Sequence, residues 1–209
     1  MSFDNILFEV TAGIARLTLN RPDKLNSFTG EMHAELRTAL DRVQSDHSVR
    51  VLINGKMPDI GNVVEKNYKQ LVLRLQNLRV PTIAAVNGIA AGAGASVALA
   101  CDLVIATKSA SFLQAFSKIG LIPDTGGTWF LPQRVGMARA MGLALLADKL
   151  PAEKAAEWGL IWECTEDADF VARIDALAKQ PSTAPTKALV RTRQAMHAAP
   201  GHTLEQQLS

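Results

Sequence analysis

The stretch PTIAAVNGIAAGAGASVALACDLVIAT, residues 81–107, contains a strand, a glycine-rich turn, a short helix and a second strand in direct succession. TIAAV and LVIAT are short, apolar runs, which is typical of buried strands. NGIAAGAG between them predicts a turn, and ASVALA predicts a short apolar helix. Strands that alternate with helices in this way indicate an α/β domain, in which helices pack on a sheet.

The residues before this stretch fit the same fold class. ILFEV and IARLTL alternate around the turn at Gly13 and predict a β-hairpin. EMHAELRTALDRVQ predicts an amphipathic helix, because Met32, Leu36, Leu40 and Val43 fall on one helical stripe. VRVLI predicts a buried strand, and VVEKNYKQLVLRLQNL predicts a second amphipathic helix that ends before Pro81.

The residues after it continue the alternation. MARAMGLALLA and PAEKAAEWG predict helices, the second with Pro151 at an N1-like position and Gly159 as its stop signal. IWEC predicts a short strand, and ARIDALAKQ and TKALVRTRQAMHA predict two late helices. The whole chain is therefore predicted to be α/β.

The composition excludes several classes of protein. The 209 residues are 48% hydrophobic and 20% charged, with a net charge of +2, so neither disorder nor nucleic-acid binding is indicated. No apolar run reaches the roughly 18 residues that a membrane span needs, and the start lacks a signal peptide's pattern, so we expect a cytoplasmic protein without a membrane partner. Cys101 and Cys164 are far apart in sequence, which favours buried reduced thiols, and the four histidines form no ligand pair, so we expect no metal.

The glycine-rich turn between the two central strands can carry chemistry. Gly92 and Gly94 begin a dinucleotide-like pattern, but Val97 occupies the third glycine position, and the lysine of a P-loop is absent. Two interpretations remain open on the residues alone. The turn either allows close packing of helix on sheet or supplies backbone N–H groups to an oxyanion.

A second unusual stretch is GLIPDTGGTWFLP, residues 120–132. Asp124 precedes an apolar, helix-like run, and a carboxylate in that position commonly caps a helix by accepting hydrogen bonds from its first N–H groups. On local grounds, Asp124 is therefore predicted to be a helix cap.

Three stretches together resemble the enoyl-CoA hydratase/isomerase (crotonase) superfamily: RPDKLNSF, residues 81–107, and the segment from IGLIPDTGG to AEWGLI. The resemblance implies a spiral of ββα units over residues 1–165, followed by a C-terminal helical region over residues 166–209 that is incomplete compared with family members. It also implies an acyl-CoA substrate and a homotrimer or hexamer. No cofactor is expected, because coenzyme A is part of the substrate.

The resemblance also implies roles for individual residues. Ala93, flanked by Gly92 and Gly94, is placed at the backbone donor of the family's oxyanion hole. Asp124 is placed at a catalytic aspartate, which reverses the local interpretation as a cap, although one residue can do both. The two hydratase glutamates are replaced by Ser96 and Phe116, neither of which is a base at neutral pH. The resemblance places four residues in the substrate pocket, namely Phe116, Ile122, Trp129 and Ser96. It also implies that Lys24 and Leu25 contact coenzyme A.

Within the superfamily, IPDTGGTWFLP and AEKAAEWGLIWEC are most similar to isomerases of ring-1,2-epoxyphenylacetyl-CoA in phenylacetate breakdown. This similarity implies an isomerase that forms the oxepin product. The nearest alternative is an enoyl- or dienoyl-CoA double-bond isomerase. A hydratase, a dehalogenase and a non-catalytic partner subunit with the same fold are weaker alternatives.

One family feature is absent. Family members follow the VRVLI-like strand with a loop containing A-G-x-D-L, which supplies the other oxyanion donor, and no such loop lies between Ile53 and Met57. Either the loop has been lost, or the sequence joins residues from the two sides of a mobile loop. The intact motifs on both sides favour the second explanation.

Overall fold

The computed structural model describes residues 3–24, 26, 28–55 and 68–208. Within these residues, six strands form one sheet in the order β1-β2-β3-β4-β6-β9, and three form a second sheet in the order β5-β7-β8. In the larger sheet β1 and β2 are antiparallel and the other neighbours are parallel. The strands are β1 (Ile6–Thr11), β2 (Ile14–Leu19), β3 (Val51–Gly55), β4 (Thr82–Val86), β5 (Ile89–Ala91), β6 (Leu103–Thr107), β7 (Ser111–Leu113), β8 (Leu150–Pro151) and β9 (Glu163–Thr165).

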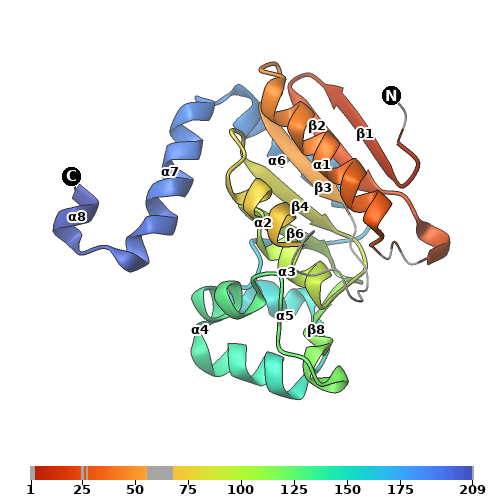
Figure 1. The fold of residues 1–209 in the computed structure, drawn as a ribbon, viewed down its shortest axis with the longest axis vertical. Helices are drawn as coiled ribbons and strands as arrows, with labels where there is room; N and C mark the ends of the chain where they lie inside the picture. Colours follow the sequence, from red (N-terminus) through yellow and green to blue (C-terminus); the bar gives the residue numbers. More distant parts are fainter. Residues whose placement is uncertain (1–2, 25, 27, 56–67, 209) are drawn as a thin grey trace.

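Helices lie on both faces of the larger sheet (Figure 1). The predicted α/β class is therefore confirmed. The α-helices are α1 (Gly30–Ser45), α2 (Lys69–Gln76), α3 (Ala93–Leu99), α4 (Gly127–Leu146), α5 (Ala152–Glu157), α6 (Phe170–Thr183), α7 (Thr186–Ala198) and α8 (Leu204–Leu208), and the 3₁₀ helices are η1 (Pro22–Lys24), η3 (Ala115–Ile119) and η4 (Ala199–Gly201).

The predictions of a hairpin and of a first amphipathic helix are confirmed. β1 and β2 pair from Ile6 with Leu19 to Thr11 with Ile14, which is the expected hairpin. α1 begins after Thr29, whose hydroxyl accepts a hydrogen bond from the N–H of Met32 at 3.2 Å. The four residues predicted to form its apolar stripe are all buried: Met32, Leu36, Leu40 and Val43.

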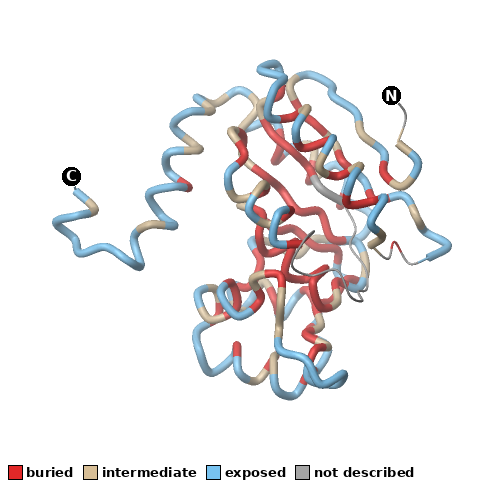
Figure 2. Tube along the Cα trace, viewed as in Figure 1, coloured by how far each residue is buried: buried red, intermediate tan, exposed pale blue. Residues whose placement is uncertain are grey.

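Alternation along the central strands divides the core into two halves. Leu52 and Val104 belong to the cluster that α1, α2 and α3 cover, whereas Val51, Ile53 and Ile105 belong to the cluster that α6 covers. Successive side chains of a strand point to opposite faces, so a sheet covered on both faces needs apolar residues at every position. Figure 2 accordingly shows these central strands as buried.

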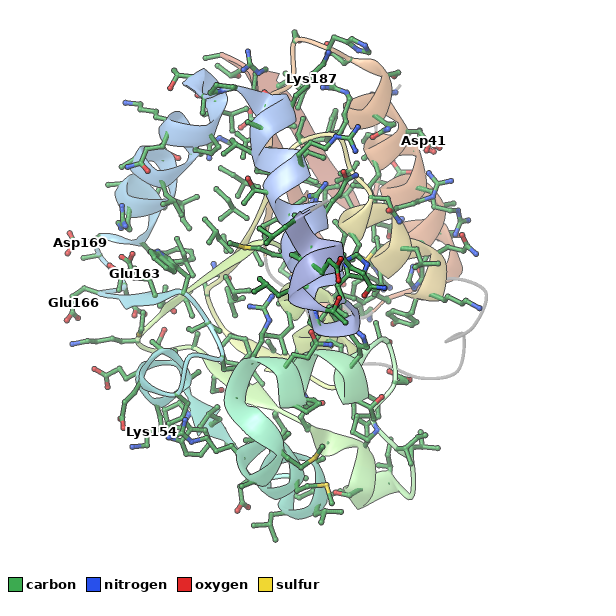
Figure 3. All side chains as sticks on the ribbon, turned by 90° about the vertical axis from the view of Figure 1, so that its left-hand side faces the viewer. Asp41, Lys154, Glu163, Glu166, Asp169 and Lys187 are labelled. Carbon is green, nitrogen blue, oxygen red and sulfur yellow. The ribbon has the colours of Figure 1, made fainter. Side chains whose placement is uncertain are left out.

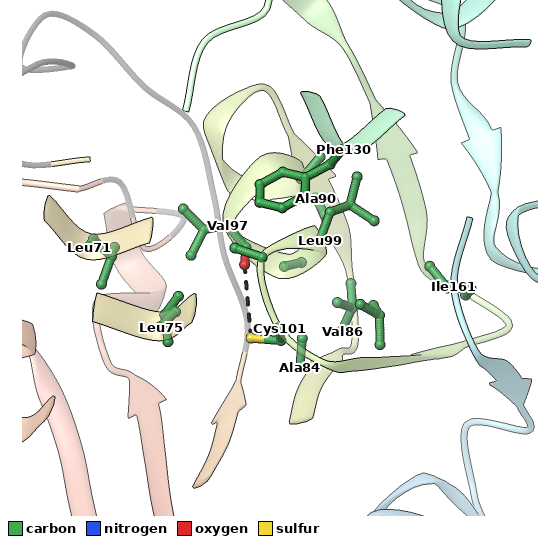
Figure 4. Packing of buried hydrophobic residues seen from close by; sticks show 14 of the residues in the cluster. Leu71, Leu75, Ala84, Val86, Ala90, Val97, Leu99, Cys101, Phe130 and Ile161 are labelled. Atoms are coloured by element: carbon green, nitrogen blue, oxygen red, sulfur yellow. Dashed lines mark hydrogen bonds between the residues drawn. The ribbon is translucent and has the colours of Figure 1, made fainter. Parts of the chain in front are cut away.

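Helix α3 lies in the middle of the first half of the core, and all seven of its residues are buried. Figure 4 shows Val97 and Leu99 of this helix close to Phe130 of α4. The Sγ of Cys101 donates to the carbonyl oxygen of Val97 at 3.9 Å, and burial raises the pKa of this thiol to about 12. Cys101 is thus an inert core residue, as predicted.

Several local predictions need correction. NGIAAGAG is not only a turn, because it contains β5, whose partner β7 was not predicted. MARAMGLALLA is part of α4, which starts ten residues earlier at Gly127 and kinks at Gly136, where φ is 76°. Pro151 is the N-cap of α5 and not its first residue, and Cys164 is only half-buried.

The C-terminal helices α7 and α8 extend away from the sheet (Figure 1). Arg193 is the buried residue of α7, and its guanidinium contacts Asp102 at 3.0 Å. Most other charged side chains lie on the outside of the molecule, including Asp41, Lys154 and Lys187 (Figure 3). Arg193 thus connects α7 to the core, and Thr186 at the start of α7 adds a second long-range contact by accepting a hydrogen bond from Arg50.

Two sequence predictions lie outside the described residues. The first is the coenzyme A contact at Leu25. The second is the missing loop expected between Ile53 and Met57, because residues 56 and 57 are not described. The division into two regions at residue 165 also stays a prediction.

Candidate active site

The glycine-rich turn places the start of α3 at the end of β5. Gly92 is the N-cap of α3 with φ of 54° and ψ of −124°, a conformation that suits glycine. Its N–H donates to the carbonyl oxygen of Leu113 in β7 at 2.8 Å, which holds the turn against the smaller sheet. Among the described residues, no backbone acceptor pairs with the N–H of Ala93, as expected in the first turn of a helix.

Asp124 begins a tight turn that leads into α4. The N–H of Gly127 donates to the carbonyl oxygen of Asp124 at 2.8 Å, and the two central residues, Thr125 and Gly126, have φ of 54° and 84°. Two positive φ values within an i to i+3 hydrogen bond are the pattern of a type I′ turn. A Cβ on Gly126 would lie 2.7 Å from the ring of Phe130, so this position also excludes a side chain.

The side chain of Asp124 does not cap α4. The N-cap is Gly126, which makes no side-chain capping bond, so the local interpretation of Asp124 as a cap is wrong. The carboxylate instead accepts a hydrogen bond at Oδ1 from the hydroxyl of Thr125, at 2.7 Å. Burial raises the pKa of Asp124 above its ordinary value, and the Thr125 hydrogen bond opposes this effect.

The turn and the glycine-rich segment meet at Ser96. A Cβ on Gly127 would lie 3.0 Å from the Oγ of Ser96 and 3.1 Å from the Cβ of Pro123. Ser96 is fully buried, and its hydroxyl donates to the carbonyl oxygen of Gly92 at 3.4 Å. Since Ser96 and Ala93 are three residues apart on α3, they share a face of the helix. The tertiary structure therefore brings the Asp124 turn to the first turn of α3.

The other predicted pocket residues are not all enclosed. Phe116 in η3 is buried, whereas Ile122 is 79% exposed and Trp129 is 45% exposed. The ring of Trp129 packs edge-on against that of Phe130, with centroids 5.0 Å apart. Ile122, which the resemblance placed in the substrate pocket, is therefore not enclosed within a single chain. Lys24, at the end of η1, is exposed.

Two residues at this site were not predicted. Thr125 bonds to Asp124 as described above, and the buried Gln114 places its Oε1 3.7 Å from the Cβ position of Gly127. This oxygen has no hydrogen-bond partner among the described residues. The signals available in the sequence were a threonine inside a DTGG turn and a single amide within the apolar run SFLQAF.

A cavity among the described residues lies elsewhere. It has a volume of about 560 Å³ and is lined by Asp102, Arg134, Arg193 and apolar residues of α6 and α7. Asp102 follows the C-terminal end of α3, whereas Ala93 is at its N-terminal end. This cavity is therefore separate from the candidate site.

Within the described part of the chain, no three His, Cys, Asp or Glu side chains are grouped so that they could hold a metal ion. None of its helices is both long and apolar enough to span a membrane.

Comparison with known proteins gives concordant results. The model of the enoyl-CoA hydratase/isomerase family matches residues 9–60 and 54–209. The two matched segments meet at residues 54–60, close to where the expected loop is absent from the sequence.

Individual relatives cover nearly the whole chain. A 1,2-epoxyphenylacetyl-CoA isomerase from Escherichia coli (strain K12) is 47% identical over 97% of this chain and 86% of its own length. A probable enoyl-CoA hydratase from Rhodobacter capsulatus is 42% identical over 100% of this chain and 87% of its own length. The crystal structure of an enoyl-CoA hydratase/isomerase from Cupriavidus metallidurans CH34 superposes with a TM-score of 0.91 at 30% identity, covering 100% of this chain and 85% of that one.

Proposed function

The chain belongs to the enoyl-CoA hydratase/isomerase (crotonase) family, and from that premise we propose that it is an isomerase of ring-1,2-epoxyphenylacetyl-CoA. The reaction opens the epoxide into the isomeric seven-membered oxepin, so no atom is added or lost. The observation that carries the proposal is the half-buried carboxylate of Asp124, in a turn that packs against the first turn of α3.

In the proposed reaction, the N–H of Ala93 donates a hydrogen bond to the thioester oxygen of the substrate. Its support is the conformation of Gly92, which leaves this N–H without a backbone acceptor among the described residues. A donor aimed at a developing oxyanion stabilises the enolate and acidifies the carbon next to the carbonyl. Removing one such donor typically lowers kcat by about 10²–10³-fold.

Asp124 is proposed to carry the proton to and from the substrate. A carboxylate of ordinary acidity is a weak base at neutral pH, and a raised pKa brings it closer to the operating pH. Burial changes the pKa of Asp124 in this direction. The same carboxylate can return the proton to another atom of the substrate, as an isomerisation requires.

Hydration is disfavoured by the residues at the two positions that carry glutamates in family hydratases. Ser96 is fully buried and in contact with the Asp124 turn, and Phe116 is buried as well. Neither side chain can activate a water molecule as a base at neutral pH. The similarity to a probable hydratase therefore supports membership of the family more than it supports that reaction.

The test is the substitution Asp124→Asn, which keeps the size of the side chain but cannot accept a proton. We expect normal folding and normal binding of the CoA thioester, with isomerisation reduced by about 10²–10⁴-fold. Asp148→Asn is the matched control, since Asp148 is exposed at the end of α4 and should keep full activity. An Asp124→Asn enzyme with unchanged turnover would disprove the assignment.

Double-bond isomerisation of an enoyl-CoA is the second candidate, because it needs the same oxyanion donor and the same carboxylate. Turnover of the ring epoxide and of a β,γ-enoyl-CoA should be measured in parallel on the wild-type enzyme. Higher kcat/KM on the epoxide is expected. Higher kcat/KM on the enoyl-CoA would select the second candidate, and no turnover of either would indicate a non-catalytic subunit.

A further inference from the structure

We propose that Thr125 is a positioning residue, whose hydroxyl holds the carboxylate of Asp124 in one orientation and determines which of its two oxygens transfers the proton. This inference rests on the proposed role of Asp124. It goes beyond that role because it assigns a function to a side chain that does not itself need to touch the substrate.

The contact that supports the proposal is short and shielded. The Thr125 hydroxyl donates to Oδ1 of Asp124 at 2.7 Å, and Thr125 is only 7% exposed. Water therefore competes weakly for this hydrogen bond, and hydrogen bonds to charged acceptors are stronger than neutral ones. Oδ1 accepts from Thr125, whereas Oδ2 accepts from no side chain in the described part of the chain, so we assign the proton that Asp124 takes from a substrate to Oδ2.

The backbone supplies an independent observation. Thr125 has φ of 54°, in the left-handed region that β-branched residues rarely adopt. The first central position of a type I′ turn favours asparagine, aspartate or glycine, so threonine is a poor choice for the turn alone. Strained residues of this kind cluster at functional sites, and the hydroxyl of Thr125 is the feature that the favoured glycine lacks.

The two residues that follow Thr125 in the turn are tightly packed. Gly126 packs against the ring of Phe130, and Gly127 packs against Ser96 and Pro123. The backbone of Thr125 is thereby fixed relative to α3, which carries Ala93. A hydrogen bond from a fixed hydroxyl positions the carboxylate relative to the oxyanion donor, which is the kind of preorganisation that proton transfer needs.

Three variants separate positioning from stability. Thr125→Val removes the hydroxyl and keeps the β-branched shape, Thr125→Ser keeps the hydroxyl, and Thr125→Gly removes the hydroxyl while relieving the backbone. The matched control is Thr128→Val, at an exposed threonine three residues further along the chain.

We expect Thr125→Val and Thr125→Gly to lower kcat/KM by about tenfold, the effect of one hydrogen bond to a charged group. In the wild type the Thr125 hydrogen bond favours the carboxylate form and lowers the pKa of Asp124. Its loss should raise this pKa, so the acidic limb of the pH profile should move to higher pH in both variants. Thr125→Ser and Thr128→Val should keep the wild-type profile. Thr125→Gly also relieves the left-handed backbone, so a pH shift that it shares with Thr125→Val comes from the lost hydroxyl and not from backbone strain.

A ¹³C NMR titration of the Asp124 carboxyl carbon provides a readout that does not depend on turnover. An unchanged titration in both Thr125→Val and Thr125→Gly, or the same shift in Thr125→Ser as in Thr125→Val, would overturn the proposal. If Asp124→Asn kept full activity, the proposed function would fail instead, and the NMR titration would still decide whether Thr125 controls the carboxyl group.

Discussion

Replacing Arg193 by methionine removes the guanidinium that holds α7 on the core and keeps an apolar stem of similar length. Arg193 Nη1 donates to Oδ2 of Asp102 at 3.0 Å and to the carbonyl oxygen of Val80 at 3.3 Å, and Nη2 donates to the carbonyl oxygen of Leu78. The exposed fractions of the two charged side chains are 6% for Arg193 and 20% for Asp102. The variant therefore leaves a carboxylate and two carbonyl groups without their cationic donor.

The expected loss of unfolding free energy is about 3 kcal/mol. Removing one partner of a buried ion pair typically costs about 3–5 kcal/mol. The lower end applies here because Asp102 keeps two hydrogen bonds from Thr82, from its N–H at 2.8 Å and from its hydroxyl at 3.1 Å. Since Arg193 is the one buried residue of α7, we also expect this helix to detach before the sheet unfolds.

Urea unfolding followed by circular dichroism measures the free energy, and hydrogen exchange by mass spectrometry measures protection along α7. Arg191→Met is the matched control, because Arg191 is exposed on the same helix, where its guanidinium donates to Oε1 of Gln194 at 3.3 Å. Its effect should stay within about 0.5 kcal/mol. An Arg193→Met protein with wild-type stability and undiminished protection of α7 would refute the reasoning.

Two other predictions concern pH and assembly. Burial lowers the pKa of His33 from 6.5 to about 4, so the unfolded chain takes up a proton before the folded chain does as the pH falls. The free energy of unfolding should therefore decline between pH 6.5 and 4, by up to about 3 kcal/mol. His33→Phe, which keeps a ring between Phe28 and Tyr68, should flatten this decline in chemical denaturation at each pH, and an equally steep decline would contradict it. We also expect a homotrimer or hexamer, because α4 exposes Met137, Met141 and Leu145 at 65%, 49% and 64%. Light scattering at micromolar concentration tests this, and a stable monomer would exclude it.

Local patterns were sufficient for much of the fold. The hairpin of β1 and β2, the apolar stripe of α1 and the strands β4 and β6 follow from hydrophobic patterns, which depend only on neighbouring residues. The small sheet β5-β7-β8 was not predicted, because its strands have two or three residues and no period can be recognised over so short a run.

The residue types of the candidate site could also be recognised from the sequence. Ala93 in its small-residue turn and Asp124 between Pro123 and the glycine pair stand in order along the chain, and family resemblance assigned them roles. The residues around Asp124, taken without the resemblance, nevertheless favoured a cap, since a carboxylate before a helix has that role more often. The tertiary structure excluded the cap by placing Gly126 at the N-cap position.

Contacts between distant segments were determined only by the tertiary structure. Ser96 meets Gly127 across 31 positions, and Arg193 meets Asp102 across 91. The bond from Thr125 to Asp124 joins adjacent residues, yet it also depends on the fold, because packing of Gly126 on Phe130 and of Gly127 on Ser96 holds Thr125 in its left-handed conformation. Sequence periodicity specifies which side chains are buried. The orientation of a carboxylate follows from the packing of the elements on both sides of it, which no local pattern encodes.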